Sequence, residues 1–250
     1  MTEPLYRAHV MVCGGTGCKS LDPEDIAGAL LAEVTRRGLA DEVRVVSTGC
    51  RGFCSMGPIV VIHPDGIFYS AVHMKDVADI VEETLVKGRV VERLLYQEPI
   101  SQQRLPKYEE IPFYGKQVRI ALRNCGAINP DVIEEYIARG GYEALGRALT
   151  TMAPDQVIEA VKKSGLRGRG GAGFPTGLKW EFTRKAQANQ KYLICNADEG
   201  DPGAFMDRSI LEGDPHSVLE GMAIAAYAIG AREGYIYCRA EYPLAIQRLK

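Results

Sequence analysis

Two pairs of cysteines near the N-terminus constrain the fold of this chain more than any other feature. Cys13 and Cys18 are separated by four residues, and Cys50 and Cys54 by three. Each pair lies in a glycine-containing loop that follows a predicted strand, so four thiolates could meet at one place. Such a group indicates a metal centre, and the spacing alone leaves a structural zinc ion and a [2Fe–2S] cluster both open.

The remaining composition excludes several classes of protein. Seven cysteines, four of them in tight pairs, do not form the pattern of a secreted disulfide framework and favour a reducing compartment. A net charge of −2 gives no general attraction to nucleic acid or anionic lipid. The N-terminus lacks the pattern of a signal peptide, and the apolar run 221–230 is too short for a membrane span. We therefore expect a cytoplasmic protein.

The first part of the chain predicts a small β-α-β-β-β-α domain. Hydrophobic periodicity and turn residues define its elements, with Asp22 and Pro23 beginning the first helix and Gly38 ending it. The expected strands are 7–12, 43–47, 59–62 and 67–69, and the expected helices are 23–37 and 75–86.

The second part alternates helix and strand, which predicts an α/β domain. Residues 97–117 contain three prolines and little periodicity, so we expect a linker there. Cys125, Cys195 and Cys238 stand alone and are expected as small core residues. The expected strands are 117–122, 192–195 (of the buried type) and 235–238, and the expected helices are 129–140, 142–149, 154–164, 176–188, 214–229 and 243–250.

The cysteine pairs and the run 57–61 that follows them resemble a thioredoxin-like [2Fe–2S] ferredoxin. The resemblance covers residues 1 to about 90 and includes all four ligand positions. It implies a domain over 1–96 in which Cys13, Cys18, Cys50 and Cys54 hold a [2Fe–2S] cluster.

A glycine- and arginine-rich loop at 165–173 is the main feature of the second part. It matches the pattern G-x-G-x-x-G, which indicates a Rossmann dinucleotide site when a strand precedes it. Here a predicted helix precedes it, so the ordinary Rossmann interpretation fails. Cationic side chains nevertheless flank the loop, and an acidic turn, 196–201, ends the next predicted strand, where α/β sheets bind ligands. These features predict a phosphate-bearing cofactor.

Segments 165–182, 196–208 and 235–242 are similar to the NADH-binding flavoprotein subunit of respiratory complex I. They are equally similar to its relatives in NAD-linked [FeFe]-hydrogenases and NAD-dependent formate dehydrogenases. The resemblance implies FMN and NAD(H) and a non-classical Rossmann-like α/β domain from residue 118 to 250. The cofactor-binding residues that it implies are Gly168, Arg169, Gly170, Phe174, Lys179, Phe182, Asn196, Asp198, Glu199, Asp201, Tyr237 and Glu241.

The implied roles differ along this set. The glycine loop meets FMN and the incoming nucleotide, Lys179 and the acidic turn contact the flavin, and Tyr237 and Glu241 form a second wall. Phe174 and Phe182 match aromatics that stack on adenine, although either could instead be a core residue, and Glu241 could be a charge at a helix start. Gly200-Asp201 stands where many complex I members have Ser-Glu, so NADH and NADPH both stay open.

The resemblance implies an NAD(P)H:acceptor oxidoreductase subunit with no protein nucleophile or general base. Hydride exchanges between NADH and FMN, and electrons then pass singly through iron–sulfur clusters to partner subunits. A [2Fe–2S] domain ahead of the flavin domain looks more like a soluble hydrogenase subunit, including the electron-bifurcating kind, than the complex I subunit. The alternative is the equivalent subunit of an NAD-dependent formate dehydrogenase or of complex I. We expect as partners a small [2Fe–2S] subunit and a hydrogenase or formate dehydrogenase catalytic subunit.

Two other interpretations stay open at this stage: an iron–sulfur scaffold with a vestigial flavin site, and a zinc-stabilised nucleotide-binding regulator. The family also continues beyond the point where this sequence stops. We therefore expect Lys250 to lie inside a longer polypeptide that carries a [4Fe–4S] motif further on.

Overall fold

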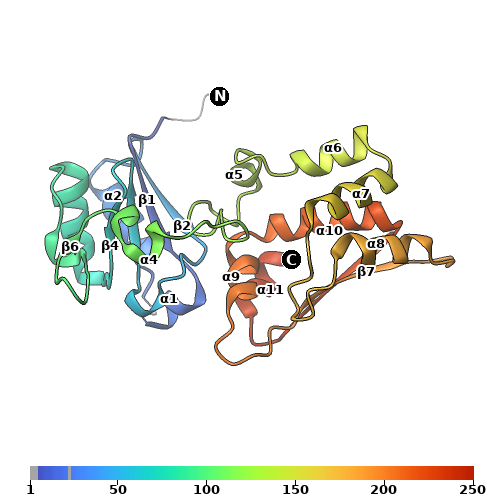
Figure 1. The fold of residues 1–250 in the computed structure, drawn as a ribbon. Coiled ribbons are helices and arrows are strands. Elements are labelled where there is room, and N and C mark those ends of the chain that lie inside the picture. The colour runs from blue at the N-terminus through green and yellow to red at the C-terminus, as the bar shows by residue number, and fades with distance from the viewer. Residues whose placement is uncertain (1–4, 22–23) are drawn as a thin grey trace. The chain divides into compact units, whose positions relative to one another are not determined.

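The computed structural model describes residues 5–21 and 24–250. Its contacts divide the chain into a first unit, Met1–Asp131 with Glu212–Asp214, and a second unit, Val132–Leu211 with Pro215–Lys250. Figure 1 colours the first unit mainly blue to green and the second mainly yellow to red. Among the described residues, no helix combines the length and hydrophobicity needed to cross a bilayer.

The first unit is built on a mixed four-stranded sheet in the order β2-β1-β3-β4. The central strand β1 pairs in parallel with β2 and antiparallel with β3, which continues antiparallel to β4. The mixed α/β class is confirmed, and the strands predicted at 7–12, 43–47, 59–62 and 67–69 are each found within one residue of their expected ends. The strands are β1 (Ala8–Cys13), β2 (Val43–Thr48), β3 (Val60–His63) and β4 (Ile67–Tyr69).

Helix α2 (Ile26–Arg36) packs on this sheet through Ile26, Leu30 and Val34, which are buried. The Asp25 carboxylate accepts a hydrogen bond from the Gly28 amide at 3.0 Å, so the helix begins three residues later than predicted. The predicted start at residues 22 and 23 lies outside the described residues. The glycine end is confirmed, because Gly38 has φ +71°.

The first unit contains two further helical segments before residue 90. Helix α1 (Thr16–Leu21) lies within the first cysteine loop and was not predicted. The expected helix 75–86 is a continuous helical segment with three geometries: a 3₁₀ turn (Met74–Asp76), α3 (Val77–Asp79) and a π-helix (Ile80–Val86).

The segment expected as a linker packs on the first unit. It contains the hairpin of β5 (Tyr96–Gln97) and β6 (Arg104–Leu105) and the short helix α4 (Pro112–Gly115). Ile111 and Tyr114 are buried in the same apolar cluster as Cys13 and Cys18. The strand predicted at 117–122 is wrong: these residues form no strand, and Ile120 is 74% exposed.

The second unit packs helices against a parallel pair of strands. Figure 1 shows α7, α8 and α10 side by side, and their contacts agree. Helices α6, α7 and α10 are found as predicted, α5 and α8 are shorter, and α9 was not predicted. The elements are α5 (Ile133–Ile137), α6 (Glu143–Thr151), α7 (Pro154–Ser164), α8 (Thr176–Lys185), β7 (Tyr192–Ala197), α9 (Met206–Gly213), α10 (Pro215–Ile229), β8 (Glu233–Cys238) and α11 (Pro243–Leu249).

The two faces of the β7–β8 pair differ. One face packs into an apolar cluster that includes Ala197, Cys195 and Ile236. The other face is exposed and carries Ile194 and Tyr235, which lie opposite each other in the register. The prediction of a buried-type strand at 192–195 is therefore wrong, since β7 alternates between core and solvent.

Candidate functional site

The four predicted ligand cysteines meet at one edge of the first unit's sheet. Cys13 ends β1 and Cys18 lies in α1, while Cys50 and Cys54 belong to the loop that follows β2. Since β1 and β2 are parallel neighbours, the loops after them leave the same edge. The Cys50 and Cys54 Sγ atoms are 3.5 Å apart, and the Cys13 thiol is within hydrogen-bonding reach of Cys18 and Cys50.

Glycines let the backbone approach these sulfurs. A Cβ atom on Gly17 would stand 2.7 Å from the Cys54 Sγ, and one on Gly57 would stand 2.7 Å from the Cys18 Sγ. Both distances are too short for any side chain. The Gly52 amide also donates a hydrogen bond to the Cys50 Sγ at 3.3 Å. The protein thus surrounds the sulfurs closely, as iron–sulfur sites require.

The thiols do not ionise independently. Hydrogen bonds to Cys18 and Cys50, together with burial, raise the pKa of Cys13 well above its ordinary value. The Cys13 hydrogen bond lowers the pKa of Cys18, although burial opposes this. Like charges this close resist ionising together, so four thiolates need bound cations. The donor set fits a metal centre.

Two kinds of metal centre use four thiolate ligands, a structural zinc ion and a [2Fe–2S] cluster. Over residues 5–21 and 24–250, no three Cys, His, Asp or Glu side chains already have the spacing of a single-ion site. The spacing of the four thiolates therefore does not by itself separate a zinc ion from a [2Fe–2S] cluster.

The glycine loop of the second unit is a closed and preformed turn. The Gly168 amide donates to the Phe174 carbonyl at 2.8 Å, and the Thr176 amide donates to the Leu166 carbonyl at 2.9 Å. Within the loop, the Arg167 Nε donates to the carbonyl of Gly173, which has φ +62°. Gly168 is half-buried, while Arg169 and Gly170 are exposed, so solvent reaches the tip of the loop.

Two aromatic rings stand beside this loop. Phe174 follows it and Phe182 belongs to α8, and their ring centroids are 6.4 Å apart with a 50° tilt. They are 43% and 60% exposed, so neither is a core residue. Lys179, on the same helix, is also exposed. The structure thus brings the loop, both rings and the lysine together on one surface.

Glu199 of the acidic turn is occupied by the fold. Its carboxylate accepts hydrogen bonds from the Asp207 and Arg208 amides at 3.0 and 3.2 Å, and from the Tyr242 hydroxyl at 3.0 Å. Burial alone would raise the pKa of Glu199, but these hydrogen bonds outweigh it and lower the pKa. The side chain caps α9, so it holds the turn in place.

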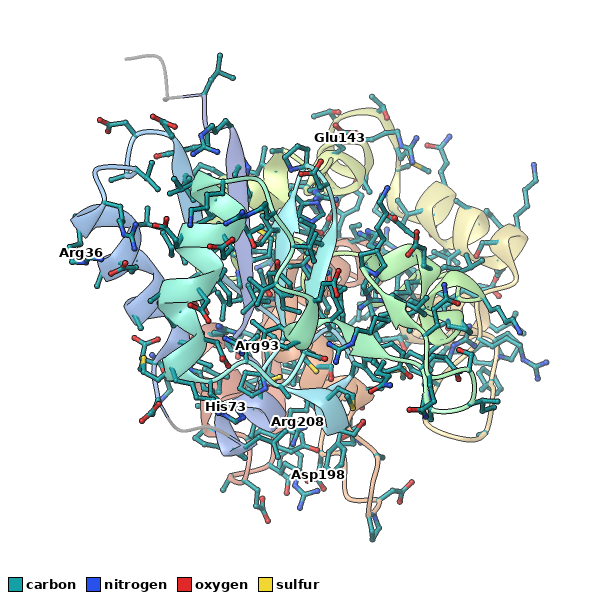
Figure 2. All side chains as sticks on the ribbon, turned by 90° about the vertical axis from the view of Figure 1, so that its left-hand side faces the viewer. Arg36, His73, Arg93, Glu143, Asp198 and Arg208 are labelled. Atoms are coloured by element: carbon teal, nitrogen blue, oxygen red, sulfur yellow. The ribbon has the colours of Figure 1, made fainter. Side chains whose placement is uncertain are left out.

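The other predicted residues of this edge stay open to solvent. Asn196, whose Oδ1 accepts from the Asp198 amide at 3.1 Å, lies opposite Tyr237 in the β7–β8 register. Asp198, labelled in Figure 2, is exposed, as are Asp201 and Glu241. In the part of the chain that the structure describes, no hydrogen bond joins this strand-edge group to the glycine-loop group.

Three residues that the sequence did not single out support these sites. Arg239 donates from Nη1 to the Glu199 carbonyl, and buried Tyr242 donates to its carboxylate. Arg51 stands between two ligand cysteines and is buried. Its position inside the second cysteine loop was visible in the sequence, whereas the contacts of Arg239 and Tyr242 depend on the fold.

Comparisons with known proteins now bear on these sites. Residues 161–250 match the family described as the Nuo51 FMN-binding domain. This part of the chain is therefore similar to that family. The relationship to the complex I flavoprotein subunit and its hydrogenase relatives, inferred from segments 165–182, 196–208 and 235–242, is thereby confirmed.

Three relatives of the chain are informative. The NADP-reducing hydrogenase subunit HndC of Solidesulfovibrio fructosivorans is 65% identical over 54% of this chain and 27% of its own length. An NADH-quinone oxidoreductase subunit of Rhizobium meliloti is 54% identical over 52% of this chain and 31% of its own. The NAD-reducing hydrogenase HoxS subunit alpha of Cupriavidus necator is 37% identical over 97% of this chain and 38% of its own. The chain therefore spans less than half of each relative.

Proposed function

We propose that this chain is part of a flavin- and iron–sulfur-containing NAD(P)H oxidoreductase subunit, most similar in organisation to that of a soluble NAD(P)-reducing hydrogenase. One observation carries the proposal: the hydrogenase subunit HoxS alpha aligns over 97% of the chain, through both units. The NADH-quinone oxidoreductase relative aligns over 52%. We favour a hydrogenase as the partner, because the relative that aligns through both units is a hydrogenase subunit.

The first unit supplies a thioredoxin-like [2Fe–2S] domain in this proposal. Cys13, Cys18, Cys50 and Cys54 would hold the cluster, and the glycines beside their sulfurs keep side chains away. The domain boundaries 1–96 and 118–250 are proposed with it, and the connecting segment 97–117 packs on the first unit. A cytoplasmic location is proposed with it, because four cysteines in two tight pairs suit a metal site in a reducing compartment.

The second unit supplies the nucleotide and flavin site. Bound FMN would provide the conversion between a two-electron hydride and single electrons that the cluster can carry. The chain's own residues bind and orient the cofactor. The amides of the glycine loop donate hydrogen bonds to phosphate, Arg169 neutralises its charge, and Lys179 adds a second positive charge. Phe174 and Phe182 offer exposed ring faces to an adenine base.

The residues of the acidic turn have two different roles, ligand binding and support of the turn itself. Asn196, Asp198 and Asp201 present acceptor groups at the carboxyl edge of the strands, with Tyr237 and Glu241 beside them. We assign Glu199 a positioning role, because its carboxylate caps α9. The proposal covers both NADH and NADPH as the nucleotide.

The test of the flavin site is retention of FMN by matched lysine variants. Lys179→Met should lower the FMN content of the purified protein, because a cation beside the flavin is removed. Lys163→Met, at the exposed end of α7, makes the same change in charge and should leave FMN unchanged. Equal FMN in both variants would exclude Lys179 from the site.

A further inference from the structure

Arg51 is a buried cation inside the cysteine loop. It follows Cys50 directly, and its side chain is 7% exposed. The guanidinium lies over the Tyr108 ring, 5.6 Å from the centroid. On another side, a Cβ atom on Gly126, which has φ +80°, would come within 2.3 Å of the Arg51 Cγ. The side chain is therefore held in one place by the surrounding fold.

The Arg51 guanidinium has few hydrogen-bond acceptors around it. Among the described residues, the Nε and Nη2 atoms have no hydrogen-bond acceptor, and no carboxylate forms an ion pair with the guanidinium. A buried arginine in this condition is costly and calls for an anion. Burial lowers the pKa of Arg51, and attraction to Tyr108 and to the nearby Cys13 thiol opposes this.

The surrounding residues reinforce the placement. The Tyr114 hydroxyl donates to the Arg51 carbonyl at 3.3 Å, which fixes the backbone between the two ligand cysteines. Arg119 donates to the Tyr108 hydroxyl at 3.0 Å and so orients the ring that covers the guanidinium. Two segments far from the cysteines in the sequence thus fix the position of Arg51 within the second cysteine loop.

We propose that Arg51 is the internal counter-charge of the four-cysteine cluster and raises its reduction potential. The inference rests on the proposed [2Fe–2S] site. A cluster held by four thiolates is anionic, and reduction adds one more negative charge, so a fixed cation stabilises the reduced form more than the oxidised form. The Nε and Nη2 nitrogens of Arg51, which lack acceptors among the described residues, are donors of the kind that tune such clusters.

The test is a comparison of midpoint potentials in the anaerobically purified chain. Arg51→Met removes the charge and keeps an apolar stem; Arg51→Lys keeps the charge without the planar fork. Arg36→Met is the matched control, because Arg36 lies at the outer end of α2 and is exposed (Figure 2). Each protein is titrated with dithionite while the reduced-cluster electron paramagnetic resonance signal is followed, and its iron content is measured.

The account predicts that Arg51→Met, at full iron content, shifts the one-electron equilibrium toward the oxidised cluster about tenfold, or about 59 mV. Arg51→Lys should stay within about threefold of the parent protein, and Arg36→Met should equal it, because salt screens a distant surface charge. An unchanged potential in Arg51→Met would overturn the proposal and leave Arg51 as a packing residue.

The lysine variant keeps the test decisive if the methionine variant does not fold. A tenfold shift in Arg51→Lys at full iron content would show that something other than charge controls the potential, and would also overturn the proposal. A parent protein without any cluster would instead contradict the proposed function, so the two failures are distinguishable.

Discussion

At the scale of single residues, Glu199 is the clearest example of a side chain that positions the acidic turn and does not bind the flavin directly. It was predicted to contact the flavin, yet its carboxylate caps α9 and accepts from Tyr242. Glu199→Gln should lower the free energy of unfolding by about 1 kcal/mol at neutral pH, since amide hydrogen bonds to a carboxylate are lost. Urea denaturation of the two proteins measures the difference.

The same residue makes a pH prediction. Because the pKa of Glu199 is lowered in the folded protein, its stabilising contribution is present above the ordinary glutamate pKa of 4.5. That contribution is lost as the pH falls below this value, through the folded pKa. The stability difference from Glu199→Gln should therefore shrink in acid. Asp201→Asn, in the same turn but exposed, should show no such loss; equal effects of the two changes would contradict the capping role.

Phe174 is the residue that tests nucleotide access. Phe174→Ala should weaken NADH binding by about 1 to 3 kcal/mol, the range for a base stacked on an aromatic ring. FMN content should change less, and stability should hardly change, because the ring is 43% exposed. Tyr192→Ala removes a comparably exposed ring on the open face of β7 and serves as control. An unchanged KM for NADH in Phe174→Ala would exclude Phe174 from the adenine site.

At the scale of elements, the segment around α4 matters because it covers the cysteine site. Tyr114 is buried, its ring is 4.0 Å from that of Tyr108 and 5.5 Å from that of Phe53, and burial raises its pKa. Tyr114→Ala should cost about 3 kcal/mol of stability, as for other large buried aromatics. The unfolding of the first unit, followed by circular dichroism in urea, provides the measurement.

The neighbouring Phe113 is the control for that change. Phe113 is half exposed, so Phe113→Ala should cost clearly less than Tyr114→Ala. If both changes were equally mild, the segment would be a loose linker rather than part of the first unit.

Elements with strong local signals could be predicted. Helix α7 has a proline start, an apolar stripe and Gly165 at its end, and its bounds match the prediction. Helix α1 has only six residues, and its sequence carries glycine and cysteine, so no periodicity indicated it. Residues 117–122 look like a strand because they alternate, but no neighbouring strand pairs with them. Strand pairing is a property of the fold and not of the segment.

At the scale of the whole molecule, we expect the iron–sulfur cluster and FMN to bind to two separately packed units. Cys50→Ala should abolish the iron–sulfur signal, because one of four thiolate ligands is removed. The second unit should still retain FMN, because its core contains none of the four cysteines. Electron paramagnetic resonance and flavin analysis of one preparation measure both; joint loss would contradict independent units.

Some residues of the candidate sites could be predicted from the sequence, and others depend on contacts that only the fold brings about. The cysteine group and the glycine loop could be predicted because residues close together in the sequence form them, whereas the choice of a [2Fe–2S] cluster and of FMN depended on the resemblance to known families. The role of Arg51 depends on Tyr108, Tyr114 and Gly126, and the cap formed by Glu199 depends on α9. These contacts join residues that are distant in the chain or elements that were not predicted, so spacing could not show them.

The most direct test of the central claim is the visible absorption spectrum of the anaerobically purified protein. The account predicts a coloured protein with overlapping iron–sulfur and flavin bands that lose intensity on chemical reduction. A colourless protein that contains zinc would contradict it.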